Sequence, residues 1–162
     1  MSADARFGLL AHPPYPCRMS LQSEFIRFHR AVYERTDGRI GHRLIGVPAL
    51  MLRTTGRRSG LVRVAVLPYG RDADGYVVVA SNHGREQPPA WLTNIRANPE
   101  VGLQVGRRRN PACARIVEAT DADHPRLWEL MNRANHGRYE GYRHLTSRSI
   151  PLVVVTPIPG GG

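Results

Sequence analysis

From residue 49 onward the chain is a series of short apolar segments separated by glycine, proline, asparagine and aspartate, and this pattern limits the fold most. Short apolar segments with turn residues between them are typical of an antiparallel sheet or barrel. The length of 162 residues and the 41% hydrophobic content suit one domain. The sequence therefore predicts a mainly β (α+β) domain with flanking helices and about six antiparallel strands, at residues 49–54, 61–69, 76–81, 100–105, 108–119 and 152–156.

The segment at residues 76–81 reads Tyr-Val-Val-Val-Ala-Ser. A run of β-branched residues suits a strand that is buried on both faces, so this segment is predicted to be the central strand. A short helix is predicted at residues 90–97, because Asn98 precedes a proline and is pushed out of the helical region. A second helix is predicted to follow Thr120, which forms a capping-box-like pattern with Asp123.

Residues 1–19 are rich in proline and lack periodicity, which predicts an irregular arm. Residues 20–162 are then the single domain, and it begins with an amphipathic helix. In that helix Leu21, Phe25 and Phe28 recur every three to four residues. Its other face carries arginines and could lie on an anionic membrane surface, although packing against the core is the commoner use of such a helix.

The formal net charge of +10 comes almost entirely from arginine, which indicates an anionic partner. Nucleic acid, an acidic membrane surface and a phosphorylated or carboxylated small molecule all satisfy this demand. Cys17 and Cys113 are the only cysteines, and the amino terminus lacks the layout of a secretory signal. Because no apolar run approaches the roughly 20 residues of a membrane span, we expect a cytoplasmic protein, with peripheral contact at the inner face of a membrane as an open alternative.

The segment Thr54-Thr55-Gly56-Arg57-Arg58-Ser59-Gly60 is the strongest candidate for a binding site. It brings hydroxyl, guanidinium and glycine backbone groups into one predicted turn, and these groups together suit a phosphate. The alternative is a solvated basic turn. On the following strand, Arg63 shares a face with Leu61 and Ala65, so a carboxylate or a ligand anion is expected beside it.

A second candidate site is the end of the 76–81 strand and the helix after it. Ser81 and Asn82 could hydrogen-bond to the edge of a heterocycle, and Trp91 could form a flat apolar wall, although such tryptophans are more often plain core. Tyr139 and Tyr142 follow His136 at every third residue and could line a pocket, orienting a substrate or donating a proton. Zinc-protease, paired-cysteine and Gly-x-Ser-x-Gly patterns are absent from the sequence, so metal and serine-hydrolase chemistry is disfavoured.

These segments together resemble the deazaflavin-dependent nitroreductase family of actinobacteria, from about residue 39 to residue 157. The resemblance is carried by Leu52 to Gly60 with Arg63, Val79 to Asn82, Pro89-Ala90-Trp91 with Asn94, Ala97-Asn98-Pro99 and Ile150-Pro151. It implies a split β-barrel similar to FMN-binding oxidoreductases, with the deazaflavin coenzyme F420 as hydride donor. The expected reaction is hydride transfer from the reduced deazaflavin to a quinone, a nitroaromatic compound or an activated double bond.

By the same resemblance, Arg57, Arg58, Ser59 and Arg63 would hold the phosphate and polyglutamate tail of the cofactor. The ring system would be surrounded by Ala65, Val66, Val79, Ser81, Asn82, Ala90, Trp91 and Asn94. Tyr139 and Tyr142 match the family's pocket tyrosines, so they and Ser81 are the candidates for substrate orientation and proton supply, with Tyr139 also near the cofactor.

The expected partner is a small-molecule electron acceptor, and the chain is expected to be a monomer or a homodimer. Two alternatives stay open. The same barrel could use FMN, or the chain could be a non-enzymatic binder of cofactor or nucleic acid. No metal is expected, because the cofactor itself performs the redox step.

Overall fold

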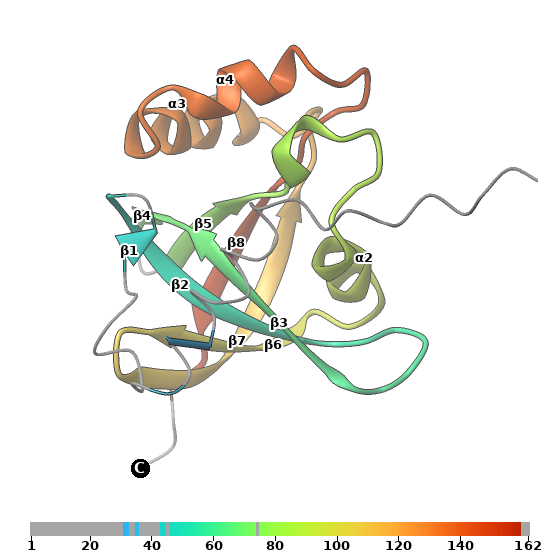
Figure 1. Cartoon of the computed structure of the whole chain (residues 1–162), viewed down its shortest axis with the longest axis vertical. Helices are drawn as coiled ribbons and strands as arrows, with labels where there is room; N and C mark the ends of the chain where they lie inside the picture. Colours follow the sequence, from blue (N-terminus) through green and yellow to red (C-terminus); the bar gives the residue numbers. More distant parts are fainter. Residues whose placement is uncertain (1–30, 33–34, 36–42, 45, 74, 160–162) are drawn as a thin grey trace, which may run out of the picture.

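Eight strands form one antiparallel sheet in the part of the chain that the structure describes, and the sheet curls into a half-open barrel (Figure 1). The structure is a computed structural model that describes residues 31–32, 35, 43–44, 46–73 and 75–159. The strands are β1 (Arg43–Leu44), β2 (Val47–Thr55), β3 (Val62–Pro68), β4 (Gly70–Asp72), β5 (Gly75–Val79), β6 (Glu100–Val105), β7 (Arg108–Val117) and β8 (Leu152–Pro157).

The strand order is β1-β2-β6-β7-β8-β5-β4, and β3 pairs with β2 as a long hairpin. The prediction of a mainly β barrel with flanking helices is confirmed, since each predicted strand matches β2, β3, β5, β6, β7 or β8. Only the short strands β1 and β4 were not predicted. The tip of the β2–β3 hairpin carries the predicted anion-binding turn.

Three α-helices and one short 3-10 turn flank the sheet in the described residues: η1 (Asn82–Gly84), α2 (Ala90–Ala97), α3 (His124–Ala134) and α4 (Arg138–Arg143). Figure 1 shows α3 and α4 together at one end of the sheet and α2 at its side. Helix α2 has the predicted bounds. Helix α3 begins later than predicted. Its N-cap is Asp123, and the turn before it is held by Asp121 Oδ2, which accepts a hydrogen bond from Glu118 N at 2.8 Å.

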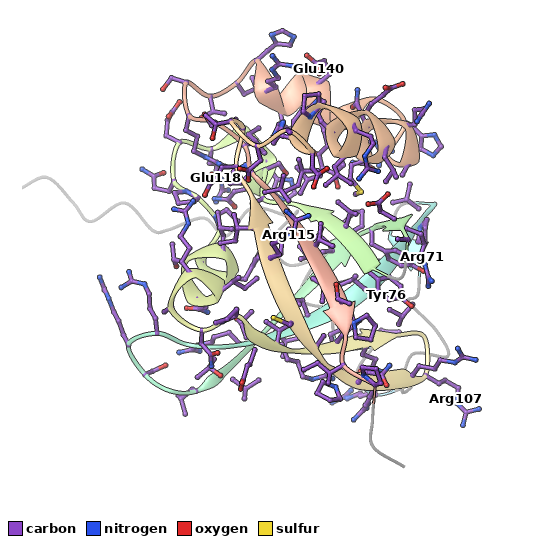
Figure 2. The ribbon with its side chains drawn as sticks, turned by 180° about the vertical axis from the view of Figure 1, so that it is seen from behind. Arg71, Tyr76, Arg107, Arg115, Glu118 and Glu140 are labelled. Atoms are coloured by element: carbon purple, nitrogen blue, oxygen red, sulfur yellow. The ribbon has the colours of Figure 1, made fainter. Side chains whose placement is uncertain are left out.

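The prediction that residues 76–81 form the central strand is wrong. β5 is the last strand but one of the order, paired with β8 and with the short edge strand β4, whose Arg71 donates a hydrogen bond to Tyr76 Oη at 2.8 Å (Figure 2). It is nevertheless buried on both faces. Val78 belongs to the barrel core with Leu50 and Leu52, whereas Val77 and Val79 pack against Leu127 and Met131 of α3. Burial on both faces therefore reflects cover by a helix, and the β-branched run carries no information about position in the sheet.

The predicted arm at residues 1–19 lies outside the described residues. So does the predicted amphipathic helix from Ser20, apart from Ala31, Val32 and Arg35, which are helical. Among the described residues no helix is both long enough and apolar enough to cross a bilayer.

Candidate active site

A pocket of about 730 Å³ lies between the β2–β3 hairpin, the end of β5 with η1, helix α2, and the corner where α3 meets α4. Every residue that was predicted to bind cofactor or substrate lines this pocket: Arg57, Arg58, Ser59, Arg63, Ala65, Val66, Val79, Ser81, Asn82, Ala90, Trp91, Asn94, Tyr139 and Tyr142. The fold thus brings segments from distant parts of the chain to one cavity. Their roles in binding stay predictions.

The turn between β2 and β3 forms one end of the pocket and is closed by backbone hydrogen bonds. Gly56 N donates to Leu61 O at 2.8 Å, and Gly60 N donates to Gly56 O at 2.8 Å. A Cβ atom at position 56 would lie 2.8 Å from Ser59 Oγ and 3.0 Å from Leu61 O, so any larger residue there would force the turn open. Gly60 takes the left-handed conformation with φ +67° that glycine adopts without strain.

The guanidinium groups of Arg57, Arg58 and Arg63 line this end, which is called the cationic end below. All three residues are exposed. Within the described part of the chain none of these groups makes a hydrogen bond or an ion pair. The prediction that Arg63 sits in an apolar setting needs correction, because the tip of the hairpin extends past the sheet and leaves the side chain in solvent. Three uncompensated charges at a pocket mouth suit an anionic ligand.

Asn94 of α2 holds the turn between β2 and β3 in place. Its Nδ2 donates to Thr54 Oγ1 at 3.0 Å, and its Oδ1 accepts a hydrogen bond from Arg57 N at 3.2 Å. Both Asn94 and Thr54 are buried. Asn94 was predicted to surround the cofactor ring, and the structure shows that its carboxamide already serves to position the cationic end.

At the end of β5 the backbone enters a strained conformation. Asn82, His83 and Gly84 have φ angles of 46°, 57° and 76°, so three successive residues are left-handed. Strain of this kind in residues other than glycine is concentrated at functional sites. Asn82 Nδ2 donates to Gln87 O at 2.8 Å, which closes the loop. Burial and the charge of Arg85 lower the pKa of His83, so its imidazole is neutral at pH 7.

Arg148 fixes this loop from the segment before β8. Its Nη2 donates to Ala80 O at 3.0 Å and to Ser81 O at 2.8 Å, and its Nε donates to Arg85 O at 2.9 Å. The guanidinium therefore clamps the backbone on both sides of the strained segment. Sequence reasoning missed this residue, because nothing in a loop arginine indicates contacts with carbonyl groups more than 60 residues away.

We expect Arg148→Gln to lower the free energy of unfolding by about 1–3 kcal/mol, because charge-assisted hydrogen bonds to two part-buried carbonyls and one exposed carbonyl are lost. The thermal unfolding midpoint measures this change, and cofactor affinity should fall with it as Ser81 moves. Arg143→Gln is the matched control, since Arg143 is exposed and makes only surface contacts among the described residues, an ion pair with Glu140 at 3.6 Å and a contact with the Trp128 ring at 6.0 Å. Equal midpoints in the two variants would contradict the clamp.

The corner between α3 and α4 forms the other end of the pocket, called the α3–α4 corner below. His136 and Gly137 are left-handed, with φ 55° and 77°, and they end α3 before α4 begins at Arg138. This break turns His136 to the exposed outside, whereas Asn135 and Arg138 line the pocket together with the two tyrosines. Sequence reasoning missed Asn135 and Arg138, because it selected His136, Tyr139 and Tyr142 by their spacing of three residues.

Tyr139 is the most buried aromatic group of this corner. Its ring lies 6.3 Å from that of Trp128 and 6.2 Å from that of Tyr142, which in turn meets His83 edge-on at 5.7 Å. Burial, with a smaller contribution from Tyr142, strongly raises the pKa of the Tyr139 hydroxyl. The group is therefore fully protonated at pH 7 and can act as a hydrogen-bond donor.

Three polar side chains in this part of the pocket lack hydrogen-bond partners among the described residues. Ser81, Asn135 and Tyr139 are 8%, 5% and 4% exposed, and all three line the pocket. Buried polar groups are normally hydrogen-bonded, so groups without a protein partner need a ligand or water. The pocket thus combines free charge at the cationic end with unsatisfied polar groups near the α3–α4 corner.

Comparison with known proteins gives one consistent result. The model of the F420H(2)-dependent quinone reductase family matches residues 25–157. A protein of Mycobacterium tuberculosis named F420H(2)-dependent quinone reductase is 44% identical over 134 residues, which cover 82% of this chain and 90% of the relative.

Two solved structures agree with this result. An F420-H2 dependent reductase has a TM-score of 0.59 and 33% identity, covering 67% of this chain and 93% of its own. A protein described as a domain-swapped dimer has a TM-score of 0.62 and 28% identity, covering 83% of this chain and 98% of its own. With this fold, this pocket and these matches, the chain belongs to the F420H2-dependent quinone reductase family.

Proposed function

We propose that the pocket binds F420H2 with its acidic tail at the cationic end and its ring beside Ser81 and Trp91, and that a quinone is reduced at the α3–α4 corner. F420H2-dependent quinone reduction is the activity of the family to which the chain belongs. The observation that carries the assignment of the site is the pairing of uncompensated guanidinium groups with unsatisfied buried polar groups in one cavity.

The residues present fit the cofactor. Phosphate and carboxylate groups of the tail match in charge the guanidinium groups of Arg57, Arg58 and Arg63, which have no partner among the described residues. The ring of a deazaflavin carries both N–H and carbonyl groups on one edge, and Ser81 offers a hydroxyl that has no other partner among the described residues. Trp91 lines the same cavity and offers a flat apolar surface.

The bound cofactor supplies a hydride. Reduction of a quinone to a hydroquinone needs two electrons, which the hydride carries, and one proton in addition to it. Tyr139 is the best-placed group to orient the quinone and pass this proton on, because its hydroxyl is buried and has no partner among the described residues. Its raised pKa disfavours a lasting tyrosinate, so a proton from solvent must replace the one that it gives. Tyr142 borders the same space and helps to exclude water, and Arg148 holds Ser81 at a fixed position.

The proposal also includes other electron acceptors, the oligomeric state and the location of the protein. Nitroaromatic compounds and activated double bonds are further acceptors expected from the same hydride chemistry. A solved relative forms a domain-swapped dimer, so a homodimer of this chain is expected as well. A cytoplasmic location suits a soluble reduced coenzyme.

Titration of the purified protein with F420, followed by cofactor fluorescence, tests this proposal. We expect a dissociation constant in the micromolar range or tighter, weaker binding of FMN, and oxidation of F420H2 that depends on added menadione. A yellow protein that retains FMN on purification and does not bind F420 would contradict the proposal and support the flavin alternative.

A further inference from the structure

Asn135 is a buried polar residue that the proposed steps do not use. It caps the end of α3, it is 5% exposed, and it is one of the residues that line the pocket. Its backbone is satisfied, since Asn135 N donates to Met131 O at 3.0 Å and Arg138 N donates to Asn135 O at 3.3 Å. Its carboxamide has no hydrogen-bond partner among the described residues. A buried carboxamide without a partner is costly, so a pocket ligand is expected to satisfy it.

The backbone around Asn135 fixes where this carboxamide lies. His136 and Gly137 take left-handed conformations directly after it, and Gly137 N donates to Asn132 O at 2.8 Å. This arrangement ends the helix sharply and leaves Tyr139 lining the same pocket four residues further on. Figure 1 shows that the α3–α4 corner and the tip of the β2–β3 hairpin lie at different ends of the molecule. Asn135 is therefore on the side of the pocket away from the cationic end.

We propose that Asn135 is a specificity-determining residue that binds the electron acceptor, with Nδ2 donating a hydrogen bond to a carbonyl oxygen of the quinone. This inference rests on the proposed function. A quinone oxygen only accepts hydrogen bonds, and a carboxamide has two N–H donors available for it. Together with the Tyr139 hydroxyl, Asn135 gives the acceptor end of the pocket two unsatisfied donors, which matches an acceptor that carries carbonyl oxygens.

A site that donates hydrogen bonds favours electron acceptors that carry carbonyl oxygens. An electron acceptor without a carbonyl leaves the buried hydrogen-bond donor unpaired. Loss of the donor should therefore weaken binding of carbonyl-bearing acceptors and leave others unchanged. Menadione and phenazine methosulfate are suitable probes, since both accept a hydride equivalent and only menadione has carbonyl oxygens.

Asn135→Leu and Asn135→Asp test the proposal. Leucine has a similar size without a donor, and an ionised aspartate has the same shape but only accepts hydrogen bonds. Binding of menadione to the cofactor-free protein is measured by quenching of the fluorescence of Trp91 and Trp128. We expect menadione binding and the KM for menadione to be weakened about 3- to 10-fold in both variants, as loss of one hydrogen bond implies. The KM for phenazine methosulfate and the affinity for F420 should stay at the wild-type values.

Asn132→Leu is the matched control. It lies on the same helix and its Oδ1 accepts a hydrogen bond from Glu140 N at 3.3 Å, but it does not line the pocket. We expect its menadione affinity to equal that of the wild type, and thermal unfolding establishes that all variants are folded.

Wild-type menadione affinity in both Asn135 variants would overturn the inference. Weakened F420 affinity with unchanged menadione affinity would also overturn it, because the residue would then belong to the cofactor. Failure of the wild-type protein to bind F420 would instead overturn the proposed function, so the two failures are distinguishable.

Discussion

Tyr139→Phe is expected to lower kcat for quinone reduction by roughly 10- to 100-fold while making the folded protein more stable. The fall in kcat follows from loss of the buried phenol hydroxyl at the α3–α4 corner of the pocket. The gain in stability follows because the hydroxyl lacks a protein partner there, and removing an unsatisfied buried group relieves about 1 kcal/mol. The unfolding midpoint should rise by about 2–4 °C.

Steady-state kinetics and thermal unfolding of the cofactor-free protein measure the two effects together. Tyr69→Phe is the control, because Tyr69 packs edge-on against Tyr76 at 5.3 Å and does not line the pocket. A stability loss in Tyr139→Phe would mean that the hydroxyl has a structural partner. Unchanged kcat would remove Tyr139 from the proton-supplying role.

Arg58→Ala combined with Arg63→Ala is expected to weaken F420 binding by roughly 50-fold, as loss of two charge-assisted contacts at exposed positions implies. The fold should be unaffected, since neither guanidinium has a partner within the described part of the chain. The dependence of the F420 dissociation constant on salt concentration should also become shallower, because fewer charges meet the acidic tail. Fluorescence titration at several salt concentrations measures both quantities.

The control is Arg107→Ala combined with Arg108→Ala, which also removes two positive charges but at positions outside the pocket. Arg107 lies in the turn before β7 and Arg108 is the first residue of β7, both outside the pocket, and Figure 2 shows Arg107 extending outward from that turn. We expect this control to keep F420 affinity within about twofold of the wild type, since only long-range attraction is lost. Equal losses in the two double variants would show that net charge, and not the cationic end, attracts the cofactor.

Much of the fold could be predicted because it depends on local signals. The bounds of α2 and β6 follow from a proline after the helix and from apolar runs between turn residues. The strand order could not be predicted, because pairing of β5 with β8 joins segments far apart in the chain and leaves no local pattern. The same limit explains why burial of β5 was misread as a central position.

The residues of the candidate site could be named largely through resemblance, since single segments such as the turn from Thr54 to Gly60 also suit a solvated hairpin tip. Sequence reasoning missed Arg148 and Asn135 for separate reasons. Arg148 acts through carbonyl groups 67 and 68 residues away, which no sequence motif records. Asn135 enters the pocket only because the helix breaks at His136, a residue that carries no strong signal for a left-handed conformation.

The two ends of the pocket are built by independent stretches of chain, the β2–β3 hairpin and the α3–α4 corner. A substitution in one of these stretches therefore leaves the residues at the other end of the pocket unchanged. If the proposed function holds, substitutions between residues 135 and 142 should change the choice of oxidant and leave the contacts of the cationic end with the coenzyme unchanged.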